Sequence, residues 1–364
     1  MSKAEQVRQW LHEITQLAAE IDRPLRLMEV CGTHTMSIFR SGLPSLLPAN
    51  VQLLSGPGCP VCVTSQADID RLIEIAEQSL VLCSYGDMLR VPGRRGSLER
   101  ARSAGADVRV IYSAMDVLRF ARQEPQRQFV FAGIGFETTA PATAAMILSA
   151  KRAELRNLSV LSLHKRVVPA LWALLAQAGL RLDGILLPGH VSIVIGSDAY
   201  RGLPERSTLP MAVAGFEDWQ LVQAVRQLLQ QIAAGEHRLV NLYEEAVSPE
   251  GNAAALEMLD LVFEPTTANW RGLGEIATSG YALRPEFSQF DAVQRWKLSA
   301  GNSREHPMCR CGDIITGRAQ PPDCALFAHA CTPTQPIGPC MVSSEGTCQA
   351  WFKYRRRERP ELVS

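Results

Sequence analysis

The stretch LRLMEVCGTH (residues 25–34) places a short apolar run directly before a polar turn, and FVFAGIGFETT (residues 129–139) repeats this pattern roughly one hundred residues later. Short apolar runs that alternate with helical stretches are typical of βαβ units and a parallel sheet. We expect two sets of four strands: residues 25–30, 51–54, 80–83 and 108–112, then residues 129–134, 159–163, 184–187 and 211–214.

Two further pairs of segments indicate an internal repeat. Residues 81–87 (VLCSYGD) parallel residues 185–190 (ILLPGH), and residues 110–116 (VIYSAMD) parallel residues 213–218 (VAGFED). We therefore predict an α/β fold with two similar four-stranded parallel-sheet α/β domains facing a cleft, plus a C-terminal cysteine-rich domain packed with the N-terminal helix. The expected boundaries are 1–22 for the helix, 23–122 and 123–234 for the two α/β domains, and 235–364 for the C-terminal domain.

Composition excludes several classes of protein. Hydrophobic residues make up 46% of the chain and charged residues 20%, with a formal net charge of zero, so a sizeable core is expected and nucleic acid is not the expected partner. We see no signal-peptide pattern at the start and no apolar run of the roughly 18–20 residues that a membrane span needs. A cytoplasmic protein without a membrane partner is expected, and clustered cysteines there indicate metal binding or catalysis.

Most of the unusual side chains follow predicted strands. In parallel α/β sheets, ligands bind at the carboxyl ends of the strands. If the two domains face each other, one shared cleft is lined by candidate catalytic residues that all come just after strands: Cys31, His34, Cys59, Cys62, Glu137 and His190.

The turn GPGCPVC (residues 56–62) is the sharpest local signal. Its C-x-x-C spacing lets Cys59 and Cys62 form a strained disulfide or chelate one soft metal, and a following helix N-terminus favours thiolates. Cysteine and histidine, the residue types at positions 31 and 34, can both bind iron, and a histidine can also transfer protons. The alternatives are a tight turn with half-buried cysteines, core packing for Cys31, and a purely structural role for His190.

Six further cysteines lie within forty residues near the C-terminus: Cys309, Cys311, Cys324, Cys331, Cys340 and Cys348. Four-cysteine sites suit zinc or an iron–sulfur cluster. Structural zinc usually draws on two C-x₂₋₄-C pairs, which this segment lacks, so its wide spacing favours a [4Fe–4S] cluster over zinc.

Together these motifs resemble the HypD family of hydrogenase maturation factors. The resemblance covers nearly the whole chain and rests on residues 28–34, 56–62, 135–139, 188–192, 270–274, 311–313 and 341–348. It implies a scaffold on which the Fe(CN)₂CO unit of [NiFe] hydrogenase is assembled. It also implies a HypC-type chaperone and a HypE-type cyanide donor as partners.

The resemblance further implies roles for individual residues. Cys31 would hold the iron, with Cys59 and Cys62 as a redox pair or as supporting iron ligands and His34 close by. The [4Fe–4S] cluster would be held by Cys311, Cys324, Cys331 and Cys348. Cys309 and Cys340 are additional to the family pattern; they could form a disulfide beside the cluster, or one of them could replace an assigned ligand.

Two other functions compete with this interpretation. One is a cluster-linked dithiol/disulfide reductase in which Cys59 and Cys62 cycle and no mononuclear iron is held. The other is a binding module stabilised by zinc. Iron analysis separates the zinc protein from the other two, and infrared bands of CN and CO belong only to the iron-assembly scaffold.

Overall fold

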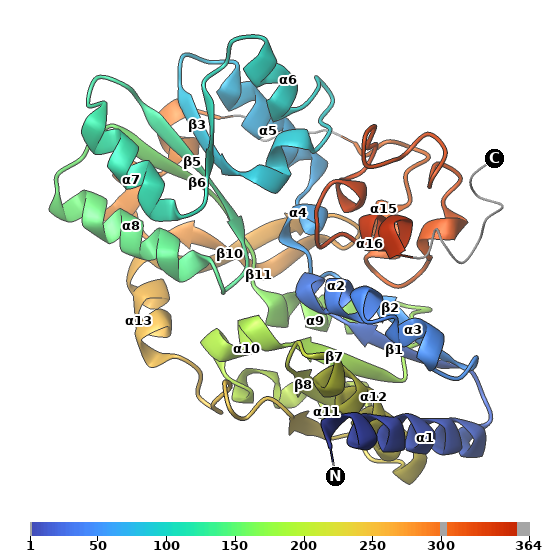
Figure 1. Cartoon of the computed structure of the whole chain (residues 1–364). Coiled ribbons are helices and arrows are strands. Elements are labelled where there is room, and N and C mark those ends of the chain that lie inside the picture. Colours follow the sequence, from blue (N-terminus) through green and yellow to red (C-terminus); the bar gives the residue numbers. More distant parts are fainter. Residues whose placement is uncertain (1, 299–303, 355–364) are drawn as a thin grey trace.

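The computed structural model describes residues 2–298 and 304–354, and it confirms an α/β fold with two parallel sheets (Figure 1). One sheet has the order β2-β1-β7-β8-β9, formed by Val51–Ser55, Leu25–Glu29, Gly184–Pro188, Met211–Ala214 and Leu239–Asn241. The other has the order β4-β3-β5-β6, formed by Val108–Ile111, Val81–Tyr85, Phe129–Gly135 and Leu158–His164. All pairings within these two sheets are parallel.

The pairing of the strands corrects the predicted domain boundaries. Residues 23–122 supply β1 and β2 to the five-stranded sheet but β3 and β4 to the four-stranded sheet. Residues 123–234 likewise divide, with β5 and β6 in one sheet and β7 and β8 in the other. A boundary at residue 122 therefore cuts both sheets, and one sheet has five strands rather than four. Local alternation of strands and helices determines where strands lie, but not which strands pair.

The internal repeat nevertheless agrees with the strand order. The sequence pairs β1 with β5, β3 with β7, and β4 with β8. Equivalent strands occupy equivalent positions, because the order β2-β1-β7-β8 in one sheet corresponds to β6-β5-β3-β4 in the other. Each half of the chain thus gives its first two strands to one sheet and its next two strands to the other.

The helices cover the sheets and connect their strands. Their bounds are α1 Lys3–Ile21, α2 Gly32–Arg40, α3 Leu43–Leu46, α4 Pro60–Val63, α5 Gln66–Ala76, α6 Leu98–Ser103, α7 Ala114–Gln123, α8 Ala140–Arg152, α9 Val167–Leu175, α10 Gly189–Ile195, α11 Gly202–Ser207, α12 Asp218–Ala234, α13 Ala253–Val262, α14 Ala292–Trp296, α15 Cys311–Ile314 and α16 Thr347–Tyr354. Short 3₁₀ turns are η1 Gly86–Arg90, η2 Asp198–Tyr200, η3 Pro285–Phe290, η4 Pro321–Asp323 and η5 Pro339–Met341.

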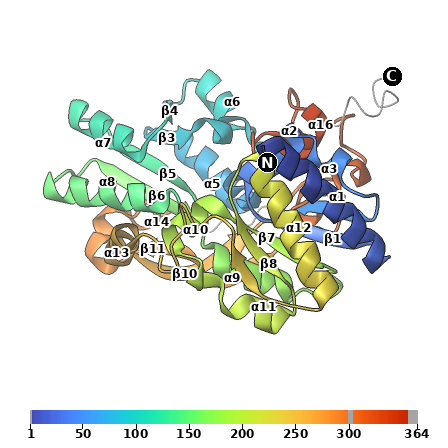
Figure 2. The ribbon, with the colours of Figure 1, turned by 60° about the horizontal axis from the view of Figure 1, so that its bottom comes forward.

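The N-terminal helix lies elsewhere than expected. Its buried face, with Trp10, Ile14 and Ala18, belongs to the same apolar cluster as α12, and the two helices run side by side in both views (Figures 1 and 2). In Figure 1, α1 is well separated from the cysteine-rich segment, which we define as residues 309–348. The apolar stripe of α1 was predicted correctly, but a stripe alone does not specify its partner.

An antiparallel hairpin in the C-terminal part was not predicted. It is formed by β10 (Phe263–Trp270) and β11 (Gly274–Leu283). Its end reaches α4, because Trp270 bridges Thr64 and the Arg271 N–H donates to the Val63 carbonyl at 2.9 Å. The hairpin therefore connects the four-stranded sheet with the C-x-x-C helix. Among the residues that the structure describes, no helix is long and apolar enough to cross a membrane.

Candidate functional site

The principal cavity lies between the carboxyl ends of strands from both sheets. It has a volume of about 600 Å³ and is bordered by the segments that follow β1, β3, β4, β5 and β7. Residues 343–345 of the cysteine-rich segment form one further wall. Cys31, the C-x-x-C turn through Gly58, Pro60 and Val61, and His190 all border this one cavity. The structure thus brings together three loops that are far apart in the sequence.

Cys31 lies at the point where β1 passes into α2. It is the N-cap residue of α2 and only 7% exposed, and its N–H donates to Glu29 Oε2 at 2.9 Å. Burial raises the pKa of the Cys31 thiol to about 12, and the carboxylates of Glu29 and Glu345 add to this effect. The free thiol is therefore protonated at neutral pH, and a bound cation would have to displace that proton.

Glu29 is a site residue that sequence reasoning missed. Its side chain is buried, and it accepts hydrogen bonds from Thr35 Oγ1 at 2.5 Å and from the Cys31 N–H. Burial raises the pKa of Glu29 to about 7, although these hydrogen bonds act in the opposite direction. The available signal was an acidic residue at the end of a mainly apolar strand, directly before the cysteine turn. Glu29 fixes the backbone that carries Cys31.

The wall formed by residues 343–345 is tied to both sheets. Asp87, after β3, accepts hydrogen bonds from Ser343 Oγ, Ser344 N and Ser344 Oγ, each at 3.1 Å. On the opposite side, Thr33 Oγ1 donates to Glu345 Oε1 at 2.8 Å. Burial raises the pKa of Glu345. These contacts hold the cysteine-rich segment across the cavity beside Cys31.

Removing the carboxylate that holds this wall should make Cys31 more accessible. We expect Asp87→Ala to increase the rate of Cys31 alkylation by N-ethylmaleimide at least about 10-fold, because three hydrogen bonds to a carboxylate are lost and even one is worth roughly 1.5–3 kcal/mol. Mass spectrometry of the peptide that contains Cys31 measures the rate. The matched control is Asp198→Ala, which removes only a surface ion pair with Arg201. Equal rates in both variants would show that residues 343–345 do not restrict access.

His34 does not face the cavity. Its buried ring lies against β8, where Nε2 is 3.2 Å from the Ala214 carbonyl and 3.0 Å from the Gly215 carbonyl. Donation to these carbonyls requires the proton on Nε2. Burial lowers the pKa of His34 to about 4, so the ring is neutral. His34 therefore joins α2 to the five-stranded sheet. It lies outside the cleft that the sequence predicted it to line.

Glu137 and His190 have different environments. Glu137 is buried and does not border the cavity, whereas its neighbours Phe136 and Thr138 do. Its Oε1 accepts a hydrogen bond from the Val167 N–H at 2.9 Å, and burial raises its pKa to about 7. His190 borders the cavity and stacks on Phe216 at 3.9 Å between ring centres, and burial lowers its pKa.

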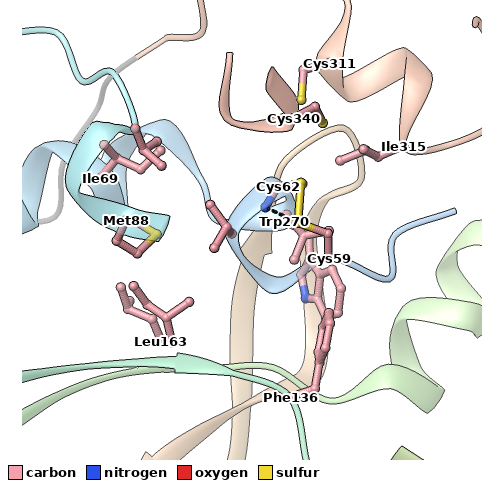
Figure 3. Close-up of a cluster of buried hydrophobic side chains, with 14 of the residues drawn as sticks. Cys59, Cys62, Ile69, Met88, Phe136, Leu163, Trp270, Cys311, Ile315 and Cys340 are labelled. Atoms are coloured by element: carbon pink, nitrogen blue, oxygen red, sulfur yellow. Dashed lines mark hydrogen bonds between the residues drawn. A yellow bond between two sulfur atoms is a disulfide. The ribbon is translucent and has the colours of Figure 1, made fainter. Parts of the chain in front are cut away.

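Cys59 and Cys62 form a disulfide with a Cα–Cα distance of 5.2 Å. Both residues are buried, at 5% and 1% exposure, and their flanking residues rather than their sulfurs border the cavity. Figure 3 shows the disulfide with Cys311 and Cys340 on one side and the rings of Trp270 and Phe136 on the other. In this oxidised state neither sulfur is free for a metal. The pair lies between the principal cavity and the cysteine-rich segment.

The six cysteines of the C-terminal segment border a single small cavity. They share it with mainly apolar neighbours, Ile314, Leu326, Phe327, Gly338 and Met341. All six are free thiols, so a Cys309–Cys340 disulfide is not formed.

Within residues 2–298 and 304–354, no group of three or more His, Cys, Asp or Glu side chains already stands in metal-binding geometry. The donor set itself fits an iron–sulfur cluster, because six soft sulfur donors surround one buried, largely apolar space. The four predicted ligands, Cys311, Cys324, Cys331 and Cys348, are all among them. Cys309 and Cys340 are equally close to this space.

Comparison with known proteins agrees with these motifs. A family model named HypD, described as "Hydrogenase formation hypA family", matches residues 5–355. A hydrogenase maturation factor HypD of Escherichia coli is 43% identical over 360 residues, covering 97% of this chain and 96% of the relative. A HypD of Azotobacter vinelandii is 46% identical over 354 residues, covering 94% and 93%. A putative hydrogenase expression/formation protein of Methanocaldococcus jannaschii is 40% identical over 350 residues, covering 96% and 97%. On these matches, the chain belongs to the HypD family.

Proposed function

We propose that this protein is a hydrogenase maturation factor that serves as the scaffold for assembling the Fe(CN)₂CO unit of [NiFe] hydrogenase. One observation carries the proposal: a buried thiol, Cys31, lies at the wall of a cavity of about 600 Å³ that both sheets and residues 343–345 enclose. A thiol at a strand end is fixed in position, while the cavity leaves space for small ligands on the opposite side of a bound metal.

Iron enters this proposal as the cargo, not as a permanent part of the protein. Thiolates are suitable ligands for low-spin Fe(II) with CN and CO, because soft sulfur donors match such an ion. Cys31 would hold the iron. Cys59 and Cys62 could support it only after their disulfide is reduced, since each sulfur is now bonded to the other. The surrounding walls would limit the access of water and oxygen.

A resident [4Fe–4S] cluster is the second part of the proposal, held by Cys311, Cys324, Cys331 and Cys348. Such a cluster stores and supplies single electrons. The residues between the two centres support this arrangement, because α4, which carries Cys62, packs against η5, which carries Cys340. Arg271 ties the end of α4 to the residues that precede the cysteine-rich segment: its guanidinium donates to the Thr64 carbonyl and pairs with Glu305 at 3.2 Å.

The proposed partners are a HypC-type chaperone and a HypE-type cyanide donor, in the cytoplasm. The resemblance supplies these partners, and the mouth of the cavity is consistent with protein docking. Tyr112 borders the cavity and is 93% exposed, and Met115 next to it is 43% exposed. Exposed aromatic and methionine side chains are favoured at protein interfaces.

A cluster-linked dithiol/disulfide reductase without mononuclear iron is the second candidate. The position of the Cys59–Cys62 disulfide beside the cysteine-rich segment favours it. In that case the disulfide would accept two electrons and two protons to give two thiols, and Cys31 would carry no iron.

Metal analysis and infrared spectroscopy of anaerobically purified protein distinguish these functions. The scaffold is expected to contain iron beyond that of one cluster and to show CN and CO stretching bands. The reductase would contain cluster iron and sulfide without these bands. A protein that contains zinc, without iron or visible absorbance, would contradict both proposals and favour the zinc-stabilised module.

The ligand assignment predicts that Cys324→Ser and Cys331→Ser each abolish the broad iron–sulfur absorbance, because a cluster that loses one of four thiolates is poorly retained. Iron and sulfide content check the result. Cys83→Ala is the matched control, since Cys83 is a buried cysteine on β3 away from the cysteine-rich segment.

The double variant Cys309→Ser/Cys340→Ser should keep a full cluster. Loss of the cluster from this double variant would mean that Cys309 or Cys340 is a ligand.

A further inference from the structure

A second cavity of about 280 Å³ lies at the carboxyl end of β6, separate from the principal cavity. No residue borders both cavities. Its walls come from the first turn of α5, the end of β6 and the hairpin β10–β11. Most of the lining side chains are polar, among them Asp68, Arg71, Lys165, Thr266, Thr267 and Glu275.

Lys165 is the unusual residue of this cavity. It is only 2% exposed, and its Nζ donates to the Asn269 carbonyl at 2.9 Å. Within the described parts of the chain, no carboxylate lies within ion-pair distance of this ammonium group. Buried lysines are rare unless they are paired, because removing a charge from water is costly.

One acidic side chain of this cavity, that of Asp68, is already engaged. Asp68 pairs with Arg71 at 3.1 Å, and its Oδ2 accepts a hydrogen bond from Ser65 Oγ at 2.7 Å. Burial lowers the pKa of Lys165 to about 8, and Asp68 opposes that effect only from a distance. At neutral pH the lysine still carries most of its charge, and no ion pair neutralises it, although the carboxylates of Asp68 and Glu275 also border the cavity.

The position of Lys165 is fixed by its surroundings. Its N–H donates to the Gly135 carbonyl at 2.9 Å, and its backbone bridges Gly280 on β11. Opposite it, the register of the hairpin shifts between Thr266 and Ala268. Such bulges redirect side chains and are frequent next to binding sites. A fixed cation and threonine hydroxyls therefore border the same polar space.

We propose that this cavity binds a small molecule through a carboxylate or phosphate group, with Lys165 as the ionic partner of that oxyanion. The hydroxyls of Thr266 and Thr267 would donate further hydrogen bonds. The competing explanation is purely structural: Lys165 would only tie the hairpin to β6 and contact the Trp270 ring, whose centre is 5.4 Å from Nζ.

The test is calorimetric titration of the full, anaerobically purified chain with inorganic phosphate and, separately, with succinate, at constant chloride concentration. We expect saturable binding of one equivalent of at least one probe, and the two titrations show which oxyanion is preferred. Lys165→Gln should weaken this binding at least about 10-fold, because a buried charge contact is lost. Lys151→Gln is the matched control: Lys151 is an exposed lysine on α8 and should bind the probe like the unmodified protein.

A second variant keeps the test informative if Lys165→Gln does not fold. Thr266→Val/Thr267→Val retains the lysine and the side-chain volumes, and we expect at least threefold weaker binding. The proposal is overturned if neither probe saturates, or if the variants at Lys165 and at the two threonines bind as tightly as the unmodified chain. Cluster absorbance and infrared bands are independent of these titrations, so failure here leaves the proposed scaffold function unaffected.

Discussion

Cys31→Ala is expected to eliminate the CN and CO stretching bands from the protein purified with its HypC-type partner, while the iron–sulfur absorbance remains. The reason is the separation of the two centres: Cys31 borders the principal cavity, whereas the proposed cluster ligands surround another one. Among the described residues, Cys31 is the only free thiol that lines the principal cavity. Its removal therefore takes away the thiolate ligand that this cavity offers to iron. Infrared and visible spectra of the same sample measure both effects.

Two comparisons sharpen this result. Cys83→Ala removes a buried cysteine that borders neither cavity and should keep the bands. Cys59→Ala should also block maturation, through lost redox cycling or lost support of the iron. If Cys31→Ala keeps the cyanide bands, the iron is held elsewhere and the Cys59–Cys62 pair becomes the better candidate.

Gly58→Ala should destabilise the protein strongly and disorganise the site. A Cβ on Gly58 would lie 2.2 Å from the Cys31 nitrogen and 2.3 Å from the Val30 carbonyl carbon. These backbone atoms directly follow β1, an inner strand, and cannot easily move aside. The Gly58 carbonyl also accepts a hydrogen bond from the Gly32 N–H at 3.0 Å. We expect a loss of about 3 kcal/mol or more in the free energy of unfolding, measured by urea denaturation.

Gly86→Ala is the matched control, because Gly86 borders the same cavity and a Cβ there would meet only a Val110 methyl group at 3.7 Å. That variant should unfold within about 1 kcal/mol of the unmodified protein. Similar urea midpoints for both variants would contradict the requirement for close approach between the C-x-x-C turn and the end of β1.

Sequence patterns predicted strands β1 to β8 and the principal cavity because both depend on local order. Apolar runs mark strands, and the residues after a parallel strand meet at one edge of the sheet. Cys31, the C-x-x-C turn and His190 therefore appear where the sequence placed them. Sheet membership was not predicted, since the same local pattern fits any partner strand.

Other features depended on contacts between distant segments. The tie between Asp87 and residues 343–345 joins positions more than 250 residues apart, and neither segment signals the other. His34 depends on such contacts too: the sequence placed it in the cleft beside Cys31, yet its Nε2 lies against the carbonyls of Ala214 and Gly215 at the end of β8. The hairpin β10–β11 was missed because its strands carry many exposed residues and lack the apolar runs of the parallel sheets.

The exchange of strands between the two halves of the chain has a consequence for synthesis on the ribosome. Strands β3 to β6 are consecutive along the chain, so the four-stranded sheet can close once residue 164 has left the ribosomal exit tunnel. β1 and β2 are made first, but β1 is an inner strand whose second neighbour is β7, where the Val30 N–H donates to the Leu186 carbonyl. Until β7 emerges, one side of β1 is an open edge, which exposes the nascent chain to aggregation. Cotranslational folding thus begins in the middle of the chain, and the thiol of Cys31 reaches its final surroundings late.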